Sequence, residues 1–94
     1  MRFAWDQQKA ESNLAAHGVT FESAKQAFDD PQAIVVFDAE HSGKRELRWW
    51  LLGRVDLKVM LVRYTHRPGG VVRIIGAGYW RQGKDIYENY WKKN

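Results

Sequence analysis

Apolar and polar residues recur along this chain with two different periods, which divide it into helical and extended parts. In the first thirty residues the period is close to that of an α-helix, which predicts amphipathic helices over residues 7–16 and 21–28. Asp6 can cap the first of these helices, since its carboxylate can accept the free N–H groups of the first turn. Ala10 and Leu14 lie four residues apart and form an apolar face of this helix.

Beyond Pro31 the pattern changes to short runs rich in β-branched residues, which predict strands. Short polar links between the later runs favour hairpins and therefore an antiparallel meander. From about residue 81, aromatic residues at four-residue spacing predict a C-terminal helix that packs on the sheet. We therefore predict a single α+β domain spanning residues 1–94, with two N-terminal helices, an antiparallel sheet of about four strands and one C-terminal helix. The predicted strands cover about residues 33–37, 47–52, 57–65 and 71–77.

Composition excludes several classes of protein. The 94 residues include no cysteine, so neither a disulfide scaffold nor a thiolate metal site is available. The spacing of His17, His41 and His66 matches no metal-binding motif, and the glycines of residues 76–78 lack the rest of a dinucleotide fingerprint. No apolar run approaches the roughly 20 residues of a membrane span, and the N-terminus has no signal-peptide pattern. We expect a cytoplasmic protein that uses no metal and no cofactor and does not bind membranes.

Charge is distributed unevenly along the chain. Residues 1–40 carry three Lys/Arg and seven Asp/Glu, a balance of −4, whereas residues 41–94 carry twelve and four, a balance of +8. Such asymmetry is typical of a polyanion-binding face in the second half, and equally of a hydrated surface that happens to be basic.

Arginines in the predicted sheet are candidates for binding phosphate. If Arg48, Arg67 and Arg73 converge, they form a guanidinium cluster beside Tyr64 and His66. Guanidinium groups bind phosphates bidentately, and aromatic rings can stack on unpaired bases. An antiparallel sheet with one hydrated face needs polar residues in any case, so the residues alone leave both interpretations open.

Two histidines outside the strands have weaker claims to chemistry. His17 stands at the end of the first predicted helix, where a cap is the more common role than catalysis. Asp38, Glu40 and His41 cluster in a loop, and we interpret this acidic loop as simply solvated.

An ordered set of short matches runs through nearly the whole chain and resembles one family. The matches are Trp5-Asp6, Lys9, Asn13, His17-Gly18-Val19, Phe21-Glu22, Ala24, Phe28, Asp30-Pro31, Asp38, His41-Ser42, Arg48, Gly53, Tyr64-Thr65, Arg67, Arg73-Ile74-Ile75 and Ala77. Together they resemble the BrnT family of toxins from type II toxin–antitoxin systems.

This resemblance implies a fold similar to RelE-type ribonuclease toxins and an activity that blocks translation by cleaving RNA. It also implies a BrnA-like antitoxin with a ribbon-helix-helix DNA-binding domain, through which the pair would bind operator DNA indirectly. One position departs from the pattern, because many family members carry an arginine where this chain has Gly78. Either that basic contact is missing here or Arg81 supplies it.

The working hypothesis is metal-independent cleavage in which a ribose 2′-OH attacks the adjacent phosphorus. Arg73, Arg67 and Arg48 would stabilise the charge that develops on the phosphate, and the proton acceptor would be His66, Tyr64 or His17. The alternatives are a catalytically attenuated toxin homologue that serves as an antitoxin-binding co-repressor, and a nucleic-acid-binding domain with no toxin role. Further residues expected to contact RNA are Arg63, Lys58, Arg81 and Lys84.

Overall fold

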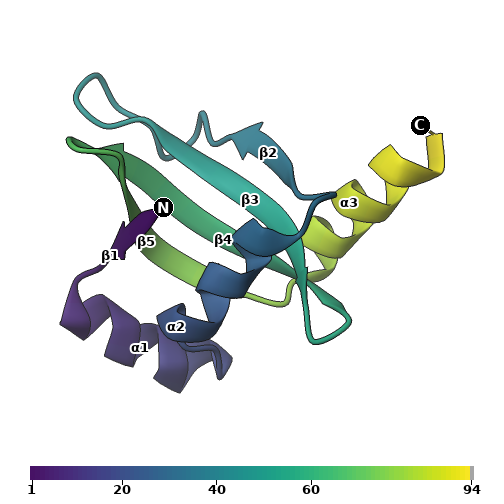
Figure 1. Ribbon diagram of the computed structural model, residues 1–94, viewed down its shortest axis with the longest axis horizontal. Coiled ribbons are helices and arrows are strands. Elements are labelled where there is room, and N and C mark those ends of the chain that lie inside the picture. Colours follow the sequence, from purple (N-terminus) through teal and green to yellow (C-terminus); the bar gives the residue numbers. More distant parts are fainter. Residues whose placement is uncertain (94) are drawn as a thin grey trace.

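The computed structural model describes residues 1–93 and has an α+β architecture (Figure 1). The prediction of two N-terminal helices, a sheet and a C-terminal helix is confirmed, with the second helix continuing as a 3-10 turn. The elements in chain order are β1 (Arg2–Ala4), α1 (Gln7–His17), α2 (Phe21–Ala24), η1 (Lys25–Asp29), β2 (Ile34–Phe37), β3 (Arg48–Val55), β4 (Lys58–Arg67), β5 (Val71–Gly78) and α3 (Arg81–Lys93).

The sheet has the strand order β1-β5-β4-β3-β2 and is mixed. Strands β2 to β5 form the predicted antiparallel meander, while the unpredicted β1 pairs parallel to β5 at one edge. Asp56 and Leu57 connect β3 to β4 with φ of 52° and 70°, and this left-handed pair matches the twist of a two-residue hairpin turn.

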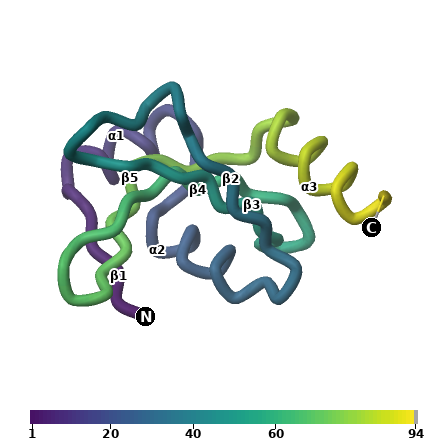
Figure 2. The backbone as a smooth tube through the Cα atoms, turned by 90° about the horizontal axis from the view of Figure 1, so that it is seen from above, coloured from purple at the N-terminus to yellow at the C-terminus, as the bar shows by residue number. Residues whose placement is uncertain are grey.

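The helices cover the two faces of the sheet unequally. α1, α2 and η1 pack against one face, while α3 lies on the other face over β3 and β4 and extends beyond the strands (Figures 1 and 2). Under the N-terminal helices lies the larger core, formed by Val19, Phe21, Ala24, Ala27, Leu51, Val55, Met60, Val62, Tyr64, Val72, Ile74 and Ala77. Under α3 lies a smaller one, formed by Leu52, Val59, Leu61 and Tyr87. The second face is therefore covered at one end only.

Close backbone packing and one polar link hold the helical segments to β3. Gly53 has no side chain, and a Cβ there would collide with the carbonyl oxygen of Ala27 in η1. The Tyr87 hydroxyl of α3 donates to Asp30 Oδ2 at 2.7 Å, and the same oxygen accepts from the Arg54 N–H of β3 at 2.8 Å. Asp30 therefore joins the end of η1 to both β3 and α3.

The buried residue of α1 is the polar Asn13, whereas the apolar Leu14 is 48% exposed. The Asn13 amide donates to the carbonyl oxygens of Val19 and Ala77 at 3.0 and 2.9 Å, and its oxygen accepts the Ala77 N–H at 3.1 Å. The Asn13 side chain thus forms the hydrogen bonds with the Ala77 backbone that a neighbouring strand would form. Ala77 lies further along β5 than residues 71–73, with which β1 pairs.

We predict that Asn13→Ala lowers the free energy of unfolding by about 3 kcal/mol, because it leaves three buried backbone groups without partners. Urea denaturation followed by circular dichroism measures this change. Ser12→Ala, at an exposed position of the same helix, should change stability by less than about 0.5 kcal/mol. Equal effects of the two substitutions would contradict the assigned role of the Asn13 amide.

Candidate functional site

Four arginines occupy the end of the sheet face that α3 leaves open. In the strand register Thr65 lies between Arg48 and Arg73, and side-chain alternation places Arg63 and Arg67 on the same face as Thr65. We call Arg48, Arg63, Arg67 and Arg73 the guanidinium face.

Two of these arginines already share an internal carboxylate. Glu46 accepts a hydrogen bond from Arg48 Nε at 2.7 Å and another from Arg67 Nη2 at 3.1 Å. The hydrogen bond from Arg48 is the main reason that the pKa of the Glu46 carboxyl lies below its usual value. Arg73, in contrast, makes no side-chain hydrogen bond or ion pair with any other residue among 1–93. Its guanidinium is therefore available to an external anion.

Beside the guanidinium face lies a buried carboxylate, Asp38, which is only 3% exposed. Both of its oxygens lie 3.0 Å from His41 Nδ1, and Oδ2 also accepts from Trp50 Nε1 at 3.0 Å. Arg63 Nε lies 3.3 Å from Oδ2, an ion pair without hydrogen-bond alignment. Burial by itself would raise the pKa of Asp38, but the hydrogen bonds from His41 and Trp50 outweigh it and hold that pKa below its usual value. The interpretation of this loop as simply solvated is therefore wrong for Asp38.

Ser42 ties the loop between β2 and β3 to the start of β3. Its hydroxyl donates to the Asp38 carbonyl oxygen at 2.7 Å and accepts the Arg48 N–H at 2.8 Å. This loop and the β4–β5 turn lie at the same end of the molecule, opposite α3, in both overall views (Figures 1 and 2). His41 is thereby held next to the guanidinium face.

Tyr64 and His66 do not lie on the guanidinium face. Alternation along β4 turns both toward the opposite face, because Arg63, Thr65 and Arg67 occupy the intervening positions. The Tyr64 ring is 5% exposed and packs edge-on against Phe28 at 5.3 Å, and burial raises the pKa of its hydroxyl.

His17 and the departure at Gly78 lie at the far end of β5 from Arg73. His17 ends α1, where its ring packs edge-on against Trp80 at a centroid distance of 4.9 Å. A Cβ at Gly78 would stand 2.8 Å from the Trp80 indole, so that the ring of Trp80 occupies the space beside this glycine.

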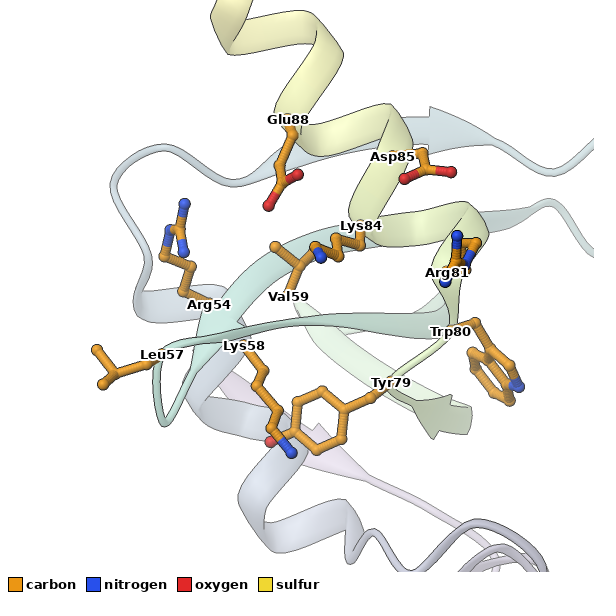
Figure 3. Close-up of a pocket in the computed structure, with 10 residues that line it drawn as sticks. All are labelled: Arg54, Leu57, Lys58, Val59, Tyr79, Trp80, Arg81, Lys84, Asp85 and Glu88. Atoms are coloured by element: carbon orange, nitrogen blue, oxygen red, sulfur yellow. The ribbon is translucent and has the colours of Figure 1, made fainter.

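The remaining basic candidates line a cleft of about 450 Å³ between the β3–β4 turn and α3 (Figure 3). Lys58, Arg81 and Lys84 are among its lining residues, and the Lys58 ammonium lies 5.4 Å from the centre of the Tyr79 ring. The cleft and the β4–β5 turn lie at opposite ends of β4, a strand of ten residues that spans about 30 Å. The structure therefore separates these three residues from the guanidinium face.

Sequence patterns did not identify Glu46, Trp50 or the pairing of Asp38 with His41 as parts of the site. One signal was available, because alternation from Ile34 and Val36 places Asp38 on the same sheet face as those apolar residues. Within residues 1–93 no group of three or more His, Cys, Asp or Glu side chains is placed to hold a metal ion. None of the helices in the same range is long and apolar enough to cross a membrane.

Comparison with known proteins identifies relatives of the chain. The profile of a family described as the ribonuclease toxin BrnT of type II toxin–antitoxin systems matches residues 5–83. The 1.1 Å crystal structure of the Brucella abortus ribonuclease toxin BrnT aligns with a TM-score of 0.67 and 21% sequence identity, over 87% of this chain and 99% of that one. No curated protein sequence matches.

We predict that Asp38→Asn lowers the free energy of unfolding by about 2 kcal/mol at about pH 5, since it removes a buried charge on which three side chains converge. The pKa of Asp38 is depressed in the folded state, so its ionised form stabilises the fold above the unfolded pKa of about 3.9. That contribution is lost as the pH falls through the lower folded value.

The stability difference between wild type and Asp38→Asn should therefore shrink in urea denaturation as the pH falls from about 5 through the unfolded pKa of about 3.9 and then through the lower folded value. Glu40→Gln, a change at an exposed carboxyl of the same loop, serves as the control. A difference that stays constant over this range would contradict the assignment.

Proposed function

Because the chain belongs to the BrnT family of ribonuclease toxins of type II toxin–antitoxin systems, we propose that it cleaves RNA on the guanidinium face. The observation that carries this proposal is the row of Arg48, Thr65 and Arg73 across three strands, at the end of the sheet face that α3 leaves uncovered. Thr65 is buried between the two partly exposed arginines, and Arg73 makes no side-chain hydrogen bond or ion pair with any other residue among 1–93. Arginine forks match the oxygens of a phosphate, so such a row suits a sugar–phosphate backbone.

The reaction we propose is attack of a ribose 2′-OH on the adjacent phosphorus without a metal ion. Negative charge grows on the phosphate oxygens in the transition state, and preorganised guanidinium groups stabilise it most where water is partly excluded. Arg73 approaches the phosphate directly, while Arg48 and Arg67 are held in place by Glu46. Because these donors are already in position, the protein needs little rearrangement while charge develops on the phosphate.

The same face is proposed as the docking surface of a BrnA-like ribbon-helix-helix antitoxin in the cytoplasm. An antitoxin that covers the arginines excludes RNA and thereby relieves the block of translation, and its own DNA-binding domain links the pair to operator DNA. The support for this is electrostatic, since a cluster of arginines attracts acidic segments of a protein partner as well as phosphates.

A second candidate function is that of an attenuated toxin that mainly holds its antitoxin and assists repression. The observation that favours it is the absence of a side chain at Gly78, beside which the Trp80 ring fills the space. Arg81 lies near the same end of β5 as Gly78, where it lines the cleft, so it adds no basic group to the guanidinium face. The two candidates differ in whether the chain arrests growth when it is produced alone.

We predict that Arg73→Ala lowers kcat/KM for cleavage of a single-stranded RNA by about 10²- to 10³-fold, because one donor to the developing charge is lost. Its unfolding free energy should stay nearly unchanged, since Arg73 makes no side-chain hydrogen bond or ion pair within residues 1–93. The measurement is cleavage by purified protein in the presence of EDTA, together with growth after induction of each variant without antitoxin.

Lys92→Ala, which removes a positive charge from the last turn of α3, is the matched control and should retain activity. Cleavage that requires an added divalent cation would refute the metal-free mechanism. Growth arrest by neither the wild type nor the variant, with expression verified, would favour the attenuated-toxin reading.

We also predict that Arg73→Glu weakens binding of the co-expressed antitoxin by about tenfold or more, because a charge reversal opposes an acidic partner segment. Isothermal titration calorimetry of the purified components measures this, with Lys92→Glu as the control of equal charge change. Equal affinities of the two variants would place the antitoxin on another surface.

A further inference from the structure

We propose that His41 is the general base that removes the proton from the attacking ribose 2′-OH, and that Asp38 is the residue that positions it. This inference rests on the proposed ribonuclease function and adds to it the proton acceptor that the guanidinium face lacks.

The hydrogen bonds of His41 determine which ring nitrogen can accept a proton. Nδ1 lies 3.0 Å from both oxygens of Asp38. An ionised carboxylate only accepts hydrogen bonds, so Nδ1 carries the hydrogen and, in the neutral ring, Nε2 is left as the acceptor. No other residue in the described part of the chain bonds to Nε2, and the side chain is 40% exposed. The ring is thus fixed at one nitrogen and open to substrate at the other.

The position of His41 is fixed relative to the guanidinium face by the same carboxylate. Asp38 Oδ2 lies 3.3 Å from Arg63 Nε, and the Asp38 backbone N–H donates to the Arg48 carbonyl oxygen at 3.0 Å. A phosphate bound by the arginines would therefore have an oriented imidazole beside it. The charged groups of the neighbouring strands are Arg48 of β3 and Arg63 and Arg67 of β4, and those of the loop itself are Asp38, Glu40, Lys44, Arg45 and Glu46.

The other candidates for the base are worse placed. Tyr64 is buried on the opposite face, where burial raises the pKa of its hydroxyl and makes deprotonation harder. His66 shares that face, and its ring packs edge-on against Tyr64 at 5.5 Å. His17 packs against Trp80 beyond the far end of β5.

His41 Nε2 takes the proton of the 2′-OH while the 2′-oxygen forms a bond to phosphorus and the bond from phosphorus to the 5′-oxygen breaks. The leaving 5′-oxygen takes a proton from solvent, and His41 later returns its own proton to solvent. The products are a 2′,3′-cyclic phosphate and a 5′-hydroxyl end, with no redox change and no added reactant.

The test is the pH dependence of kcat/KM for cleavage of a labelled single-stranded RNA by the purified full chain. For the wild type, log kcat/KM should rise with unit slope as the pH increases and then level off, as His41 loses its proton. His41→Ala should lower the plateau by about 10²- to 10³-fold and abolish the rising limb, and added imidazole should restore part of the rate. The end groups of the products are identified in the same experiment.

Asp38→Asn tests the positioning role separately. The amide keeps an acceptor for Nδ1 but removes the negative charge that stabilises the protonated ring, so the plateau should fall through kcat while KM stays nearly unchanged. Glu40→Gln, at the exposed neighbouring carboxyl, should leave both the plateau and the limb unchanged. Circular dichroism and thermal unfolding check each variant, and His41→Gln, which keeps a donor for Asp38, replaces His41→Ala if the latter fails to fold.

The outcomes separate the two levels of the proposal. A wild type that cleaves RNA together with a folded His41→Ala of equal rate and pH profile would overturn the role of His41 and leave the ribonuclease function standing. Loss of the limb in His66→Ala or His17→Ala instead would also overturn it. A wild type that cleaves no RNA, alone or with added divalent cations, would overturn both.

Discussion

The arrangement of the candidate site depends on one buried charge, the carboxylate of Asp38. A carboxylate with 3% exposure has lost nearly all of its water, and it remains ionised because donors from other segments replace that water. These donors are His41 of the loop and Trp50 of β3, and the Arg63 guanidinium of β4 adds an ion pair at 3.3 Å without hydrogen-bond alignment. The contacts that compensate this one charge therefore hold the β2–β3 loop against the sheet, and they involve both His41 and Arg63.

A second constraint is the unequal covering of the sheet. α1, α2 and η1 bury one face, whereas α3 buries only the part of the other face around Leu52 and Leu61. The remainder of that face must be polar, and this chain fills it with arginines. Four like charges close together oppose folding, and the two carboxylates of Glu46 and Asp38 compensate three of them. Among residues 1–93 no side chain compensates Arg73, at one end of this row, and an uncompensated charge of this kind is typical of a binding site rather than of a group that stabilises the fold.

Polar side chains also hold the fold together where the apolar cores are small. Asn13 continues the edge of β5 with its amide, and Asp30 links η1, β3 and α3 through two hydrogen bonds to one oxygen. Each is a short side chain whose geometry is specific, so these links define the position of the helices more sharply than apolar contact alone would. The site at the opposite end of the sheet is thereby built on a rigid support.

The sequence by itself determined the local elements, because hydrophobic period, caps and hairpin links act over a few residues. It predicted α1, the meander of β2 to β5 and α3, but it placed Tyr64 and His66 beside the arginines, whereas alternation along β4 turns both toward the opposite face. It could not reveal β1, since three residues carry no period and pair with a strand almost seventy positions away. Nor could it reveal that Glu46 bridges Arg48 and Arg67, or that the buried Asp38 carboxylate contacts both His41 and Arg63. Only the tertiary structure decided these contacts, because they depend on strand register and loop closure, which bring together side chains whose individual patterns are indistinguishable from those of a hydrated surface.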